Sequence, residues 1–120
     1  MPIINVTPHD IHILHQGARP KESWDEIIPA SGQVARCEIY RKQIGILKNI
    51  PIFHLHYGIV QGLPSPQKGT FYIVSSIVAQ AMKQTRNDLL VPVDFVRDDK
   101  GNIIGCQALG CLADWKEISL

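Results

Sequence analysis

Helical periodicity is confined to one short stretch of this 120-residue chain, and that restriction most limits the folds open to it. Within residues 76–85, Ile77, Val78, Ala81 and Met82 fall on one side of a helix, with polar side chains opposite. Elsewhere apolar residues alternate with polar ones or form short runs between turn residues, which is typical of strands. The sequence therefore predicts an α+β fold, with a mostly antiparallel sheet of about seven short strands and one amphipathic helix near 76–85.

The strands are expected where alternation or β-branched and aromatic residues are densest. These ranges are 10–15, 33–40, 51–61, 70–74, 89–91, 94–97 and 102–109, and residues 3–6 form an apolar opening before the first of them. In the range 33–40, alternation places Arg36, Glu38 and Tyr40 on one face of the strand. Composition predicts hairpin turns at 48–49 and 98–101, loops at 16–26 and 62–69, and a short helical turn or frayed tail at 114–120.

The chain length fits a single compact domain covering residues 1–120. Twelve basic residues against eleven acidic ones give a net charge of +1, which argues against binding to long nucleic acids. No apolar run approaches the roughly 20 residues of a membrane span, and the first residues do not resemble a secretory signal. Cys37, Cys106 and Cys111 form no C-x-x-C pair, so we expect reduced thiols in a cytoplasmic protein.

Two histidines are a candidate metal site. His54 and His56 form an H-x-H pair, which a strand places on one face, where two imidazoles can bind a transition metal. The pattern approaches the first cupin motif, but Gln61 occupies the place of the motif's Glu. If a metal binds, His9 or His12 is the expected third ligand. The alternative, which we favour, is that the pair lies on the wet face of a strand, and we expect no metal or other cofactor.

A strand that runs directly into the helix is the second candidate. Ser75 and Ser76 follow the strand at the expected helix N-terminus, where free amides and hydroxyl groups attract anions. No glycine-rich loop precedes this helix, and no G-x-S-x-G elbow surrounds the serines. A serine that simply caps the helix is the plainer interpretation.

Three arginines are further candidate anion contacts, because a guanidinium can hold phosphate or carboxylate by two parallel hydrogen bonds. Arg86 and Arg97 lie near the late strands, and Arg36 lies on the polar face of its strand. The alternative for Arg97 is surface pairing with Asp98 or Asp99, which contributes little to stability.

Several segments in a fixed order carry a resemblance. They are NVTPH, SGQVAR, YGIVQGLP, YIVS, RNDLLVP and VRDDKGNIIGC. Together, from about Ile3 to Leu109, they make the chain resemble a family of small, uncharacterised proteins of bacterial and bacteriophage genomes. The resemblance implies no activity. It implies a genomic setting in which small phage proteins counter host defence, one strategy being an oligomer that sequesters a nucleotide signal in the host cytoplasm.

We therefore expect a non-catalytic, homo-oligomeric protein that binds a small anionic, nucleotide-like ligand. A chain this small leaves little depth for a private pocket, so a second copy is expected to complete it. The alternatives are a structural or interaction subunit and, third, a metalloenzyme that uses His54 and His56. The residues expected to contact the ligand are His9, Arg36, Tyr57, Tyr72, Ser75, Ser76, Arg86 and Arg97.

Overall fold

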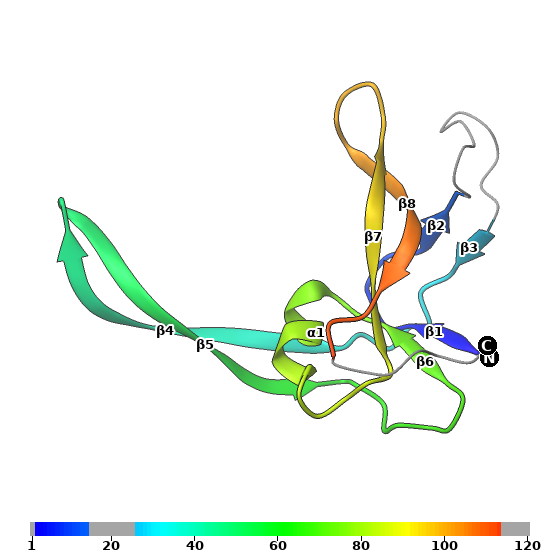
Figure 1. Cartoon of the computed structure of the whole chain (residues 1–120), viewed down its shortest axis with the longest axis horizontal. Coiled ribbons are helices and arrows are strands. Elements are labelled where there is room, and N and C mark those ends of the chain that lie inside the picture. The colour runs from blue at the N-terminus through cyan, green and yellow to red at the C-terminus, as the bar shows by residue number, and fades with distance from the viewer. Residues whose placement is uncertain (1, 15–25, 114–120) are drawn as a thin grey trace.

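The computed structural model describes residues 2–14 and 26–113, which form eight strands and one helix (Figure 1). The elements are β1 (Ile3–Asn5), β2 (Ile11–Ile13), β3 (Glu26–Ile28), β4 (Arg36–Leu47), β5 (Ile50–Gln61), β6 (Phe71–Ile73), α1 (Ser76–Met82), β7 (Leu89–Arg97) and β8 (Ile103–Gly110). The α+β class is confirmed. The expected count of about seven short strands is one too low, and three strands are long: β4, β5 and β7.

Six strands form the body of the molecule, in the order β1-β6-β7-β8-β2-β3. The β7–β8 and β2–β3 pairs are antiparallel, but β1–β6, β6–β7 and β2–β8 are parallel. The sheet is therefore mixed rather than mostly antiparallel as predicted. Parallel pairs join segments far apart in the chain, and local alternation carries no information about such pairing.

The two edges of this sheet meet at Asn5. Asn5 forms a parallel bridge with Ala30, and the amide of Ser31 donates to the Asn5 carbonyl at 2.9 Å. The buried Asn5 side chain donates to the carbonyls of His9 (2.7 Å) and Ile28 (3.1 Å) and accepts from the amide and hydroxyl of Thr7. One amide side chain thus ties the end of β1 to the segments that lead into β2 and out of β3.

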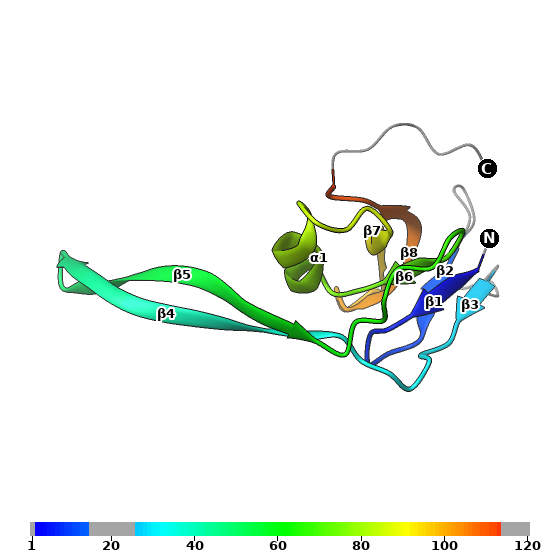
Figure 2. The same cartoon turned by 90° about the horizontal axis from the view of Figure 1, so that it is seen from below.

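The main core lies where α1 covers the β6–β7 end of the sheet (Figure 2). Tyr72, Ile73 and Val74 are buried, as predicted for the dense β-branched run. Tyr72 and Val74 belong to the same core cluster as Val78 and Ala79 of α1. The helix begins at Ser76 as expected and ends at Met82, three residues before the predicted boundary. Its last turn tightens there, because the amides of residues 85 and 86 both bond to the Met82 carbonyl.

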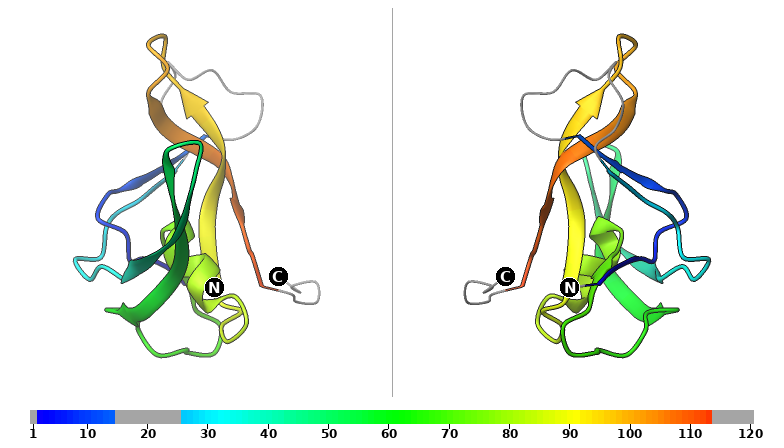
Figure 3. Two further views of the ribbon diagram at one scale, coloured as in Figure 1. Left: turned by 90° about the vertical axis from the view of Figure 1, so that its left-hand side faces the viewer. Right: turned by 90° about the vertical axis from the view of Figure 1, so that its right-hand side faces the viewer.

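β4 and β5 leave the body as a long two-stranded hairpin, which we call the arm (residues 36–61) (Figures 1 and 3). Its turn is the predicted one: Lys48 and Asn49 both have positive φ, the type I′ geometry that matches the twist of a hairpin. The radius of gyration is 16.9 Å, against roughly 14 Å for a globular chain of this length. The arm accounts for the elongated shape.

The expected loop at 16–26 and the expected tail at 114–120 lie outside the described residues, except that Glu26 already begins β3. Nothing helical in the described ranges has both the length and the apolar character needed to cross a bilayer.

Candidate functional site

A hollow of about 540 Å³ lies at the root of the arm, where four chain segments meet. We call it the root hollow. Its lining residues are Pro8, Val34, Ala35, Arg36, Cys37, Glu38, Tyr40, Ile59, Gln61, Ser75 and Ile77. Its volume lies within the range of roughly 300–1,000 Å³ that is usual for small-molecule sites.

The backbone of Val6 holds two sides of the root hollow together. Its amide donates to the Ile73 carbonyl at 3.0 Å, and its carbonyl accepts from the Ala35 amide at 2.9 Å. These two bonds place the end of β6 beside the start of β4. Arg36 and Ser75, which lie 39 positions apart in the sequence, therefore line one hollow.

The polar side chains of the root hollow are unequally engaged. The Tyr40 hydroxyl donates to Glu38 Oε2 at 2.9 Å, and this hydrogen bond, with the Glu38 charge, raises the pKa of Tyr40. By contrast, no hydrogen bond or ion pair joins the Arg36 guanidinium to any residue that the structure describes. Arg36 is therefore the group in this hollow that is ready to receive an anion.

Ser75 is the N-cap of α1. Its hydroxyl oxygen accepts from the Val78 amide at 3.4 Å, and its backbone is extended, as a cap requires. The plain capping role suggested by the sequence is therefore present, and Ser75 also lines the root hollow. Ser76, the next predicted contact, is exposed as the first residue of the helix.

Two of the other predicted ligand residues are engaged inside the protein. Tyr72 is only 1% exposed, and its hydroxyl bonds to the Ser65 carbonyl at 3.3 Å. Arg86 pairs with Asp88 through two bonds of 2.8 and 2.9 Å and donates to the Pro64 carbonyl at 3.0 Å. Both side chains therefore form hydrogen bonds within the protein, and neither lines the root hollow.

The remaining predicted contacts are scattered. Arg97 donates to the Gly101 carbonyl at 2.8 Å, across the turn of the β7–β8 hairpin. The Tyr57 hydroxyl donates to Gln80 of α1 and so fastens the arm to the helix. His9 lines a different hollow, described below. Of the eight predicted ligand residues, the root hollow brings together Arg36 and Ser75.

The histidine pair lies on the arm. His54 and His56 share one face of β5, with ring centroids 6.1 Å apart, and Tyr40 lies 5.5 Å from His56. Among residues 2–14 and 26–113, no group of three His, Cys, Asp or Glu side chains is placed to hold a metal ion. The expected third ligands, His9 and His12, line the other hollow, so the structure does not bring them to this pair.

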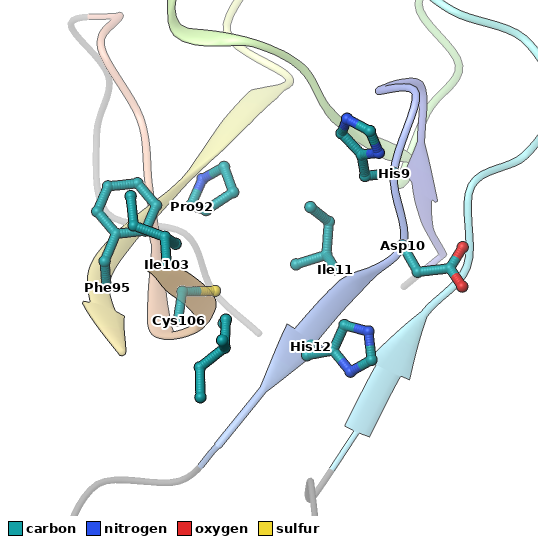
Figure 4. Close-up of a pocket in the computed structure, with 10 residues that line it drawn as sticks. His9, Asp10, Ile11, His12, Pro92, Phe95, Ile103 and Cys106 are labelled. Carbon is teal, nitrogen blue, oxygen red and sulfur yellow. The ribbon is translucent and has the colours of Figure 1, made fainter. Parts of the chain in front are cut away.

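That second hollow, the sheet hollow, has a volume of about 330 Å³ and lies between β2 and the β7–β8 hairpin (Figure 4). Apolar side chains dominate its wall, and Asp10 is the only Asp, Glu, Lys or Arg among the described residues that line it. The lining residues are His9, Asp10, Ile11, His12, Pro92, Phe95, Ile103, Ile104, Gly105 and Cys106. Burial raises the pKa of the Cys106 thiol, which keeps it protonated and unreactive.

Sequence reasoning missed Glu38, Tyr40 and Gln61 as parts of a site, although one signal was available. Strict alternation had placed Arg36, Glu38 and Tyr40 on one strand face, and all three line the root hollow. Gln61 is the register partner of Arg36 across the arm, a pairing that a single strand pattern does not reveal.

The root hollow can bind an anion but lacks a catalytic arrangement among its described lining residues. Arg36 and the hydroxyl groups of Ser75 and Tyr40 can contact a charged, hydroxyl-rich ligand. No histidine is among the described residues that line it, so none of these supplies a neutral imidazole base beside the Ser75 hydroxyl or the Cys37 thiol. In three comparisons with known proteins, the chain matches no family model, no curated protein and no solved structure.

Proposed function

We propose that this protein is a non-catalytic binding protein that holds a small anionic, nucleotide-like ligand in the root hollow. One observation carries the proposal: the fold brings the unengaged guanidinium of Arg36 and the hydroxyl of Ser75 to one hollow of about 540 Å³. In this proposal Arg36 and Ser75 bind the anion, and the Tyr40 ring covers an aromatic or sugar group. In the most specific version of this proposal, the protein is of a phage type and sequesters a nucleotide signal in the cytoplasm.

Isothermal titration calorimetry tests the proposal, with inorganic phosphate, cyclic nucleotides and ADP-ribose as probes. A hydrogen bond to a charged group contributes about 1.5–3 kcal/mol, so Arg36→Ala is expected to weaken binding by about ten-fold or more. Arg97→Ala is the matched control, because Arg97 bonds within the β7–β8 turn and does not line the hollow. Glu38→Gln is expected to strengthen binding, since it removes a negative charge from the hollow.

Absence of heat with every probe, or equal affinities for Arg36→Ala and wild type, would reject the proposal. A second candidate, a structural or interaction subunit, is favoured by the exposed apolar side chains of the arm. The two candidates differ in the titration, because a subunit of that kind would assemble without binding any of these probes.

A further inference from the structure

The arm exposes more large apolar side chains than the rest of the described structure together. Nine of the 15 large apolar side chains exposed there belong to it, and their exposed fractions reach 66% at Leu47 and 83% at Ile59. The nine are Ile39, Tyr40, Ile44, Ile46, Leu47, Ile50, Leu55, Tyr57 and Ile59. A monomeric soluble protein rarely leaves so large an apolar surface uncovered.

Both faces of the arm share this character. The register pairs Ile39 with Tyr57 and Arg41 with Leu55 on one face, and Tyr40 with His56 and Leu47 with Ile50 on the other. Each strand has a single hydrogen-bonded neighbour, so both outer edges are unpaired as well. A two-stranded hairpin of this kind is marginally stable in water without a covering partner. We therefore infer that the arm lies against another surface.

The net charge of the arm indicates which kind of surface it lies against. Residues 36–61 carry four basic side chains and one acidic one, a net charge of +3. The rest of the chain carries eight basic and ten acidic side chains, a net charge of −2. Two arms therefore repel each other, whereas an arm and the body of another copy attract.

We propose that the arm docks on the body of a second copy of this chain, with its tip in the sheet hollow of that copy. The tip presents Ile46, Leu47 and Ile50 around Lys48, all of them exposed. The sheet hollow offers an apolar wall with half-exposed Phe95 and Ile103, and Asp10 is its charged residue. Apolar surface thus meets apolar surface, and the basic tip approaches an acidic side chain.

Reach and size both fit this contact. The arm extends away from β2 and the β7–β8 hairpin of its own chain (Figure 1), and these elements line the sheet hollow, so the tip meets that surface only on another molecule. Its two strands contribute 12 residues each, and a stable interface uses roughly 20–30 residues from each partner. Two copies that exchange arms form this contact twice, and rings of more copies repeat it.

The contact is tested on the full chain, without ligand, by light scattering after size-exclusion chromatography. Wild type is expected at no less than twice 13.4 kDa. The double variant Leu47→Glu/Ile50→Glu alters only the exposed tip of the arm, and the variant Ile103→Glu alters only the exposed wall of the sheet hollow. Each variant alone is therefore expected to be monomeric. Its circular dichroism spectrum is expected to be unchanged. Gln43→Glu, an equal change of charge per site at a polar arm position, is expected to leave the mass unchanged.

Mixing the tip variant and the hollow variant in equal amounts provides the decisive step. The hollow variant keeps an intact arm, and the tip variant keeps an intact sheet hollow. The arm of the first can therefore dock in the hollow of the second, and heterodimers of about twice the monomer mass are expected. A mixture that stays monomeric overturns arm-to-hollow docking, and so does a tip variant with the wild-type mass. A monomeric wild type also overturns it and leaves the arm to a different partner. Ligand titration is a separate readout, so either proposal can fail while the other stands.

Discussion

Gly62 and Val34 pass so close to each other at the root of the arm that no side chain fits between them. A Cβ atom on Gly62 would lie 2.2 Å from the Val34 carbonyl oxygen, and Gly62 has a φ of +79°. The Gln33 side chain also donates to the Gly62 carbonyl at 2.8 Å. The two ends of the arm are thus fixed against each other by backbone contact, directly beside the root hollow.

Gly62→Ala is therefore expected to destabilise the protein strongly. The left-handed backbone costs an alanine about 1–2 kcal/mol, and the forced shift of backbone adds about 1–3 kcal/mol. Gly69→Ala is the matched control, because Gly69 has a φ of +77° but no atom within 4 Å of the added Cβ. Urea unfolding of both variants separates the two effects, and equal losses would show that the Gly62–Val34 contact does not constrain the root.

Asn5 supplies the second prediction. Asn5→Ala leaves the carbonyls of His9 and Ile28 without its donors and Thr7 without its acceptor, in a site where Asn5 is 1% exposed. Unsatisfied buried groups cost about 1–3 kcal/mol each, so a loss of about 3 kcal/mol in unfolding free energy is expected. The exposed Asn87→Ala is the control and should change stability by less than about 0.5 kcal/mol. Similar losses of stability for both variants would show that the Asn5 side chain does not hold the two edges of the sheet together.

Arg86 is expected to act in folding rather than in ligand binding. Arg86→Met leaves the Asp88 carboxylate, 12% exposed, without its ion-pair partner, and such a loss costs about 3–5 kcal/mol when fully buried. We expect about 2–4 kcal/mol here, because both groups keep some contact with water. The double variant with Asp88→Asn should lose less than the sum of the two single losses. Strict additivity would show that the pair is not coupled.

Much of the local structure could be predicted from the sequence, because local rules determine it. The period of 3.6 around Ile77 and Val78 indicates the helix, the dense run around Tyr72 indicates a buried strand, and the sequence at 98–101 indicates a turn. The Asp98 and Asn102 backbones are indeed bonded across that turn. The alternation placed Arg36 and Glu38 on one strand face, and both line the root hollow, although only Arg36 was expected to contact a ligand.

The parallel pairs and the arm could not be predicted in this way. β1 pairs with β6 across more than sixty residues, and no local pattern encodes that choice. The turn at 48–49 was predicted, but the arm exposes apolar side chains on both faces, whereas alternation predicts strands that bury one face against a sheet. Arg86 was misleading for a similar reason: its partner, Asp88, lies two residues away, but only the folded backbone turns the two side chains toward each other.

The last prediction concerns Asp98 and acid pH. Its carboxylate accepts from the backbone amides of Asn102 and Lys100, each at 2.9 Å, and the bond from Asn102 is the main cause that lowers the pKa of Asp98. A carboxyl group whose pKa is lower in the folded state stabilises the fold above its unfolded pKa, and this contribution disappears as pH falls through the folded value.

The difference in unfolding free energy between wild type and Asp98→Asn should therefore stay constant from pH 7 down to about the ordinary pKa of 3.8, and shrink as the pH falls further toward the folded pKa of the group. A carbon NMR titration of the Asp98 carboxyl measures its folded-state pKa directly. The expected midpoint lies below the ordinary value of 3.8, since protonation must break bonds that hold the β7–β8 turn. A midpoint at or above 3.8 would show that the turn does not stabilise the charged form, and the pH dependence of stability would then arise elsewhere.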